Sequence, residues 1–446
     1  MKENNLLIKN ARMIDPAGGL DESGDILIEG GVIVKTGKNI AAPLATVIDA
    51  TGLIACPGFI DLHCHLRQPG YEDKETIASG AAAAARGGFT TIYCMPNTNP
   101  PMDNAATVSH VKDIAAREAP LITILPVGCI TRSRAGRELA DMAELAAAGC
   151  VGFSDDGSPV GSSRLMSLAM QNAAGLDLPV IDHCEDLDLS RDGHMNDGWV
   201  AARLGLKGIP AAAEEAIVAR DIALSELTGA RLHVTHISTK GSVELVRDAK
   251  RRGLRVTCDV TPHHLTLTEE RVLAGQAGPG NSLAYDTNAR VNPPLRKSAD
   301  VDALIQGIKD GSIDAIATDH APHTTGDKLC EFENAASGIS GFETALGALM
   351  ALVHAGSIDL NTLIACLTSG PARVLKNGGG TLRQGSRADI VLIDAGREWT
   401  VDVRDFLSKG RNTPLDGCKL KGMVVATIGG GHFAWRTTLK PAPSGV

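Results

Sequence analysis

The sequence predicts an α/β fold, with a TIM-type (β/α)8 barrel in the middle of the chain and a small β-sandwich domain built from both chain ends. Short apolar stretches alternate eight times with helix-like segments in the middle, as successive parallel βα units do. Strand-like segments with glycine-rich turns occur at both ends. No GxGxxG sequence follows an early strand, which disfavours the alternative of a doubly wound open sheet.

The β domain is expected to combine residues 1–55 with residues 376–446, and the barrel to span residues 56–375. Similar alternation of apolar and polar residues at the two ends suggests that they pair with each other. The strand-like segments are 6–15, 24–37 and 46–52 at the start, and 387–395, 398–402, 420–431 and 432–436 at the end.

Each predicted barrel strand is followed by a helix-like stretch. One helix is expected within residues 74–88, closed by Gly87 and Gly88, and another within residues 241–253, closed by Gly253, because glycine tolerates the left-handed conformation that ends helices. The eight apolar segments are 53–65, 89–96, 121–130, 150–156, 178–185, 230–238, 255–264 and 314–323.

Composition excludes several classes of protein. The net charge is −9 with no basic run, which argues against nucleic-acid binding. The start lacks the apolar core of a signal peptide, and no run reaches the roughly 18 apolar residues of a membrane span. The ten cysteines form no CxxC pair, so we expect reduced, buried thiols in a cytoplasmic protein.

Histidine and aspartate residues gather where five of the predicted strands end. Residues i and i+2 of a strand point to the same side, so His63 and His65 could reach one ion. Taken singly, such an aspartate could cap a helix and such a histidine could be a hydrogen-bonded core residue. Convergence at the barrel mouth instead predicts a metal site. The segments are 61–65, 154–157, 182–185, 233–236 and 318–323.

The chemistry of these residues favours zinc. Imidazole and carboxylate ligands without thiolates suit Zn²⁺, with Mn²⁺ or Co²⁺ as substitutes. Cys64 lies between the two histidines and is expected to face away. The candidates outnumber the ligands of one tetrahedral ion, which suits two ions sharing a carboxylate.

Longer motifs extend over nearly the whole chain. They include PGFIDLHCHLRQPGYEDKETIASG, MPNTNPP, GFSDDGSPV, DHCED, HVTHIST, TPHHL, NPPLR and TDHAPH, with SRADIVLID and NTPLDGCKLKGMVVATIGGG near the end. In this order they resemble the dihydroorotases of the amidohydrolase superfamily, specifically the longer bacterial type. A single TDHAPH would be only suggestive, whereas the full set is specific.

This resemblance implies a zinc centre of one or two ions per chain. Asp156 would bridge them, because the carboxylated lysine of many relatives is missing from the segment GFSDDG. The preference for Asp156 over Asp155 comes from the family, since strand parity does not decide at a turn. Asp319 would also be catalytic, acting as general base and then general acid. The implied metal ligands are His63, His65, Asp156, His183, His236 and Asp319.

The resemblance also implies a set of substrate contacts. Arg67 offers a planar fork to a carboxylate, although it could instead be a surface residue paired with Glu72 or Asp73. Asparagines before proline could simply form turns. The implied contacts are His65, Arg67, Asn97, Asn292 and His323, with Ser337 and Gly338 acting mainly through the backbone. Two segments depart from the family pattern: 274–290, which is longer and expected to form a surface loop, and 335–344.

The implied reaction is the reversible hydrolysis of the cyclic amide of dihydroorotate to N-carbamoyl-L-aspartate, a step of de novo pyrimidine (UMP) biosynthesis. A metal-activated hydroxide would attack the ring carbonyl. One alternative is an allantoinase or dihydropyrimidinase, although these usually carry the bridging lysine. Another is a non-catalytic partner of aspartate transcarbamoylase, which need not keep the metal ligands. A homodimer, and association with aspartate transcarbamoylase, are expected only by resemblance.

Overall fold

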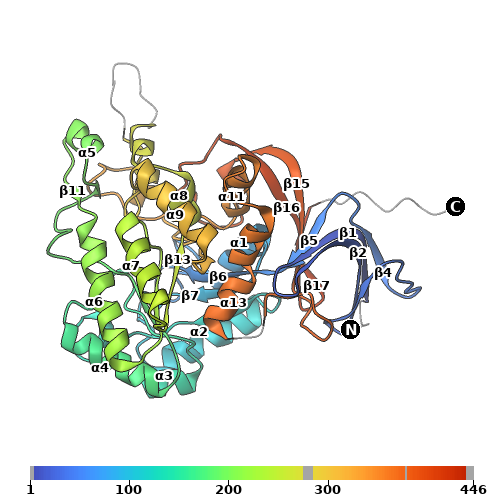
Figure 1. The fold of residues 1–446 in the computed structure, drawn as a ribbon, viewed down its shortest axis with the longest axis horizontal. Coiled ribbons are helices and arrows are strands. Elements are labelled where there is room, and N and C mark those ends of the chain that lie inside the picture. The colour runs from blue at the N-terminus through green and yellow to red at the C-terminus, as the bar shows by residue number, and fades with distance from the viewer. Residues whose placement is uncertain (1–4, 275–284, 377–378, 438–446) are drawn as a thin grey trace.

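The computed structural model describes residues 5–274, 285–376 and 379–437. Figure 1 shows helices surrounding one set of strands, and beside them a second set that brings the first and last strands of the chain together. This mixed α/β arrangement agrees with the predicted fold class. The segments between and beyond the described ranges, including residues 275–284 of the predicted surface loop, lie outside the described residues.

Strands from both ends of the chain form one sheet in the order β17-β16-β15-β5-β1-β2-β3, and β4 pairs with β1. The junction is the antiparallel pairing of β5 with β15, in which Ala55 lies opposite Leu392. The strands are β1 (Leu6–Asp15), β2 (Leu20–Glu29), β3 (Val32–Gly37), β4 (Thr46–Asp49), β5 (Ile54–Pro57), β15 (Ile390–Thr400), β16 (Lys419–Gly429) and β17 (His432–Arg436).

The sheet encloses its own apolar cluster. Ile8, Ile26, Ile390 and Ile428 are fully buried in it, so residues from both chain ends share one core. The predicted separate strands 387–395 and 398–402 are wrong, since a single strand, β15, covers most of both. Its pairing register shifts between Asp394 and Glu398, and this irregularity accounts for the break in the sequence pattern.

The strands in the middle of the chain pair in parallel. They run β6-β7-β8 in one group and β14-β13-β12-β9 in another. Phe153 bridges the residues Gly128 and Val180, and Cys64 bridges His320, so the pairings return to the strand where they began. The strands are β6 (Phe59–Cys64), β7 (Phe89–Cys94), β8 (Thr123–Pro126), β9 (Val180–Asp182), β12 (Leu232–Val234), β13 (Val256–Val260) and β14 (Ala315–Ile316), with a separate pair β10 (Met195–Asn196) and β11 (Gly208–Ile209).

The predicted strand 150–156 is wrong as a regular strand, because only Phe153 makes bridge pairings there. The Asp155 side chain accepts hydrogen bonds from the backbone N–H groups of Ile130 and Thr131, at 2.9 and 3.0 Å. A side chain therefore takes the place of ladder carbonyls, and the backbone is free to turn.

The helices form where capping residues flank apolar stretches. The Thr76 hydroxyl caps α1 by accepting from the Ser79 N–H, and Gly88 ends it in the left-handed conformation (φ 95°), so the helix predicted within 74–88 is confirmed. The helix predicted within 241–253 is α7. The helices are α1 (Ile77–Gly87), α2 (Ala105–Glu118), α3 (Met142–Ala148), α4 (Ser163–Gly175), α5 (Trp199–Leu204), α6 (Ala212–Thr228), α7 (Lys240–Arg251), α8 (Pro262–Thr266), α9 (Ser298–Asp310), α10 (Thr325–Lys328), α11 (Ala345–His354), α12 (Leu360–Leu367) and α13 (Ser369–Leu375).

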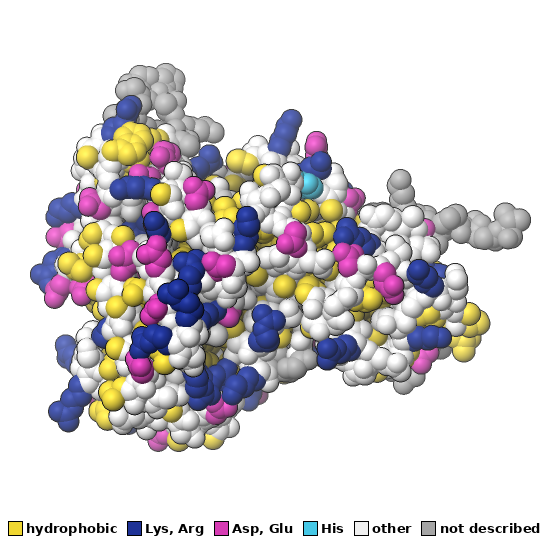
Figure 2. Space-filling view, in the orientation of Figure 1, with side chains coloured by type: hydrophobic (Ala, Val, Ile, Leu, Met, Phe, Trp, Pro, Cys, Tyr) yellow, Lys and Arg dark blue, Asp and Glu magenta, His cyan; other side chains and the backbone are white. Residues whose placement is uncertain are grey.

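The surface carries charges of both signs. On the face drawn in Figure 2, basic and acidic side chains are interspersed. All ten cysteines are free and eight are buried, the burial that their apolar sequence context predicts. Within the described ranges, no helix combines the length and apolarity needed to cross a membrane.

The contact between the two parts of the fold provides a stability test at Gly429. A Cβ there would overlap the carbonyl oxygen of Leu121, the residue just ahead of β8. Backbone cannot move aside as a side chain can, so we expect Gly429→Ala to destabilise the protein by about 1–3 kcal/mol. Thermal unfolding should show a clearly lower Tm.

Gly175 is the matched control. It ends α4, and an added Cβ would meet nothing within 4 Å. Gly175→Ala should leave Tm unchanged or slightly higher, because alanine favours helix by up to about 1 kcal/mol. Equal Tm values for the two variants would contradict the assigned packing of β16 against Leu121.

Candidate metal centre and substrate site

Six buried side chains meet at the carboxyl ends of the parallel strands. His63 belongs to β6, while the others lie just beyond strand ends or, in one case, beyond the Phe153 bridge. None is more than 6% exposed. They are all six of the predicted metal ligands: His63, His65, Asp156, His183, His236 and Asp319.

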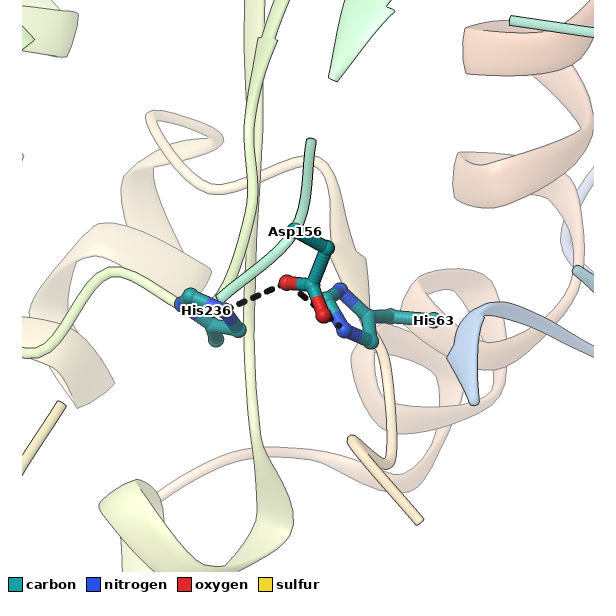
Figure 3. A group of neighbouring side chains, drawn as sticks. All are labelled: His63, Asp156 and His236. Carbon is teal, nitrogen blue, oxygen red and sulfur yellow. Dashed lines mark ion pairs between the residues drawn. The ribbon is translucent and has the colours of Figure 1, made fainter. Parts of the chain in front are cut away.

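Asp156 lies at the centre of this cluster. Its Oδ1 is 3.3 Å from His63 Nε2 and 3.8 Å from His236 Nε2, and Figure 3 shows the carboxylate between these two rings. The same oxygen is 3.8 Å from His183 Nδ1, while Oδ2 is 3.6 Å from His65 Nε2. The carboxylate therefore contacts histidines on both sides of the cluster, the position that a bridging ligand would need.

Asp319 closes the opposite side. Its Oδ1 lies 3.1 Å from His65 Nε2 and 3.6 Å from His63 Nε2. Two overlapping sets each bring their ligand atoms within 4.8 Å of one another, and His63 belongs to both. The sets are His63–Asp156–His236 and His63–His65–Asp319.

The cluster fits a divalent cation. His63 Nε2 is buried and has no hydrogen-bond partner within the described ranges. Burial lowers the pKa of His63, but the charges of Asp156 and Asp319 outweigh this effect and raise it to about 9. The two carboxylates thus favour a positive charge next to His63 Nε2, a nitrogen that no hydrogen bond occupies. A zinc ion bound by this imidazole nitrogen would supply that charge.

A third group of potential ligands differs in its surroundings. Asp182, Cys184 and Asp221 also lie close together. Arg220 Nε donates to Asp221 Oδ1 at 2.8 Å, and its Nη2 is 4.0 Å from Asp182 Oδ2. This guanidinium already supplies positive charge, so the group has less need of a metal ion.

Neighbouring strands hold the ligands in place. Thr235 Oγ1 donates to Asp259 Oδ2 and therefore accepts from His63 Nδ1 at 2.8 Å, which leaves the lone pair on Nε2. Asp259 Oδ1 also accepts from the His236 N–H at 2.7 Å. The sequence could have indicated Thr235, because strand parity places it on the same side as His233 in HVTHIST. Its role, however, depends on hydrogen bonds to residues of other strands.

Asp61 and Asp155 are further supporting residues. Asp61 accepts from the N–H and the hydroxyl of Thr318, at 2.6 and 2.7 Å, next to Asp319. Asp155 turns away from the cluster, toward Ile130 and Thr131. The geometry therefore favours Asp156 over Asp155, as the family resemblance implied.

The predicted substrate contacts lie on two sides of the cluster. On one side Arg67 Nε donates to Pro322 O at 3.2 Å, and Arg67 Nη2 is 3.2 Å from His323 Nε2. His323 Nε2 also lies 2.9 Å from Ser337 O. Burial and the charge of Arg67 lower the pKa of His323 to about 3, so its imidazole is neutral. Arg67, His323 and Ser337 form one polar group.

Arg67 has no carboxylate within salt-bridge distance among the described residues, Glu72 and Asp73 included. Its backbone adopts the left-handed region, with φ 61°. Burial lowers the pKa of its guanidinium. A partly buried cation without a protein counterion is suited to an anionic ligand.

Asn97 and Asn292 contact the six-residue His/Asp cluster itself. Asn97 Oδ1 is 2.9 Å from His65 Nδ1, and its amide donates to Asp156 Oδ2 at 3.2 Å. Asn292 Nδ2 lies 3.3 Å from His183 Nε2 and donates to Glu185 Oε2 at 2.9 Å. Both predicted asparagines are thus in the site.

The backbone of Gly338 is engaged within the protein. Its N–H donates to Arg290 O at 2.9 Å, and its carbonyl accepts from Asn412. A Cβ would lie 2.6 Å from the Cβ of Ala321, so only glycine fits. Asn412 Oδ1 also accepts from the His323 N–H. Sequence reasoning missed Asn412, which lies far from the barrel segments along the chain.

Comparisons with known proteins show which chains and folds this protein resembles. A model of the Dihydro-orotase-like family matches residues 52–242. Solved structures of similar fold include dihydropyrimidinase from Brevibacillus agri NCHU1002 and L-hydantoinase from Arthrobacter aurescens. Each is 24% identical with a TM-score of 0.83 and covers 97% of this chain, over 95% and 96% of the other chain respectively. At this identity they establish similarity of fold alone.

Two curated relatives are much closer in sequence. Dihydroorotase from Geobacter sp. (strain M21) is 48% identical over 433 residues, 97% of this chain and 99% of the relative. Dihydroorotase from Thermoanaerobacter sp. (strain X514) is 49% identical over 436 residues, 98% of each chain. With such identity over almost its whole length, this chain belongs to the dihydroorotase family.

Proposed function

We propose that this chain catalyses the reversible hydrolysis of dihydroorotate to N-carbamoyl-L-aspartate in de novo pyrimidine biosynthesis, using one or two zinc ions. The observation that carries the proposal is the juxtaposition of the His/Asp cluster with Arg67, a cation with no carboxylate in salt-bridge contact among the described residues. A metal-activated cyclic amide and an anionic substituent would then occupy adjacent places. Family membership supports the same reaction.

The architecture that we propose is a TIM-type (β/α)8 barrel over residues 56–375 and a small β-sandwich domain from residues 1–55 and 376–446. The closed circuit of parallel pairings supports the barrel, with the short bridge at Phe153 as its fourth member. The sheet shared by both chain ends supports the second domain. This arrangement would place the site at the carboxyl ends of the strands, where barrel enzymes bind substrates.

The six clustered residues would hold the zinc. When bound there, zinc would polarise a carbonyl group and lower the pKa of water. Asp319 would take the proton of the attacking water and deliver it to the leaving ring nitrogen. Burial raises the pKa of Asp319, but the hydrogen bond from His65 and the charges of the neighbouring histidines outweigh this and lower it. The carboxylate is therefore ionised and ready to accept a proton.

Arg67 would bind the substrate carboxylate through its planar fork. His323 beside it would add a neutral hydrogen-bonding group, and Asn97 and Asn292 would orient the ring. His65, Ser337 and Gly338 complete the proposed contacts, the last two through backbone atoms; for Gly338 this would be the carbonyl oxygen, because Arg290 O takes its N–H. We also propose that this protein is cytoplasmic, forms a homodimer and associates with aspartate transcarbamoylase. Family resemblance supports these three proposals.

The nearest competing activities are those of allantoinases and dihydropyrimidinases. Those enzymes usually bridge their metal ions with a lysine, whereas here Asp156 would take that role, since its carboxylate lies 3.3 Å from His63 Nε2 and 3.8 Å from His236 Nε2. Dihydrouracil also lacks the carboxylate that Arg67 would bind. Turnover of dihydroorotate, allantoin and dihydrouracil by the zinc-loaded protein should therefore be fastest for dihydroorotate. Faster turnover of allantoin would overturn the proposal.

Asp319→Asn tests the assigned proton carrier. The amide cannot take up the water's proton, so we expect kcat to fall by about 10²–10⁴-fold or more, with the fold and most of the bound zinc retained. Steady-state rates, zinc content and circular dichroism provide the readouts. Asp310→Asn, at the end of α9 and paired with Arg247, is the control and should keep wild-type kcat. A near-normal rate for Asp319→Asn would show that another group carries the proton.

Arg67→Lys tests the carboxylate contact. The change keeps the charge but removes the fork, so we expect KM for dihydroorotate to rise about 10- to 100-fold, since a hydrogen bond to a charged group contributes about 1.5–3 kcal/mol. Any residual turnover of dihydrouracil should keep its KM, because that substrate has no carboxylate. Equal losses on both substrates would mean that Arg67 supports the site structurally.

A further inference from the structure

Glu185 lies in the site, but it belongs neither to the predicted metal ligands nor to the predicted substrate contacts. It follows His183 by two residues, just beyond β9, and its side chain is 13% exposed. Such a group, enclosed beside a metal cluster, needs hydrogen-bond donors to offset its burial. Its partners therefore indicate what it does.

Those partners come from both halves of the site. Glu185 Oε2 is 3.1 Å from His183 Nε2 and accepts from Asn292 Nδ2 at 2.9 Å. One carboxylate oxygen thus joins a predicted metal ligand to a predicted substrate contact.

The contact determines which nitrogen of His183 carries a proton. A carboxylate only accepts hydrogen bonds, so His183 Nε2 must donate. In neutral imidazole the lone pair then lies on Nδ1, which faces Asp156 Oδ1 at 3.8 Å and His236 Nε2 at 3.0 Å. Nδ1 is therefore the atom available to a cation in the cluster.

The next residue, Asp186, stabilises the local turn of the chain. Asp186 Oδ1 accepts from the backbone N–H groups of Asp188 and Leu189, at 2.9 and 3.1 Å. The hydrogen bonds of Glu185 are to side chains, those of His183, Asn292 and Ser190. The two adjacent acids thus have separate roles, one in the turn and one in the site.

We propose that Glu185 is a positioning residue that keeps His183 in the Nε2–H form, with Nδ1 directed to the metal, and that orients Asn292 toward the substrate. This inference rests on the proposed function for the roles of His183 and Asn292. A carboxylate behind a histidine ligand is a known means of fixing its tautomer and raising its affinity for metal. Here the same oxygen also reaches the substrate side, so one residue would couple zinc retention to substrate binding.

Glu185→Gln is the decisive variant, because it preserves shape while removing one acceptor oxygen and the charge. A glutamine carbonyl oxygen at the place of Oε2 can still accept from His183 and Asn292, but both hydrogen bonds become weaker because the acceptor is no longer charged. We expect zinc affinity, measured by competition with a chelator, to fall about 10- to 100-fold. KM for dihydroorotate should rise even at saturating zinc, because the weaker hydrogen bond holds Asn292 less firmly.

Histidine-selective ¹⁵N NMR of the metal-free protein gives a readout that a purely structural role would not change. At a pH where the ring is neutral, His183 should be in the Nε2–H form in the wild type and a mixture of tautomers in Glu185→Gln. Glu185→Asp keeps the charge on a shorter side chain and should recover part of the zinc affinity. Asp186→Asn is the matched control, and it should retain zinc affinity, KM and the His183 tautomer.

The outcomes separate this inference from the proposed function. Unchanged zinc affinity and an unchanged tautomer in Glu185→Gln would overturn the positioning role even if the wild type hydrolyses dihydroorotate. Failure of the zinc-loaded wild type to act on dihydroorotate would overturn the function, while the tautomer and affinity shifts would still stand for the His183 contact. If Asp186→Asn reproduced every effect, the turn rather than Glu185 would be responsible.

Discussion

The buried Asp156 carboxylate among four imidazoles is the interaction on which the rest of the site depends. A carboxylate that loses its water must gain compensating charge and hydrogen bonds. The histidines provide the partners, and the raised pKa of His63 reflects the negative potential that remains. Bound protons or a divalent cation can satisfy that potential. The fit of this cluster to a metal ion therefore rests on electrostatics as well as on ligand type.

The ligands are held by a backbone that departs from ordinary strand geometry. His236 and Asp319 have φ angles of 38° and 44°, a region that costs non-glycine residues on the order of 1–3 kcal/mol each. Buried aspartates of adjacent strands offset this cost. Asp259 accepts the His236 N–H, and Asp61 accepts the N–H of Thr318 beside Asp319. Strain and its compensation thus occur together at the strand ends.

Distant parts of the chain converge on the predicted substrate contacts. Asn412 binds the backbone of His323, Ala321 and Gly338, so a segment near the C-terminus fixes the loop that carries His323. On the other side Glu185 joins His183 to Asn292. The two groups approach the metal cluster from different loops, and each is anchored independently. A substrate bridging them would be oriented by both.

The sequence by itself determined the class of fold, the two β-rich ends and the strand ends that carry the clustered histidines and aspartates. Local patterns suffice for these features, because alternation marks strands and the recurrence of histidine or aspartate at five strand ends can be read along the chain. Strand parity could not choose between Asp155 and Asp156, and only family resemblance favoured Asp156. In the folded chain Asp155 turns to the N–H groups of Ile130 and Thr131, because at a turn the side-chain direction depends on which backbone N–H groups the neighbouring segment offers. The tertiary structure also revealed Thr235, Asp259, Glu185 and Asn412 as supporting residues. Their roles arise from hydrogen bonds between segments that only folding brings within about 3 Å of each other.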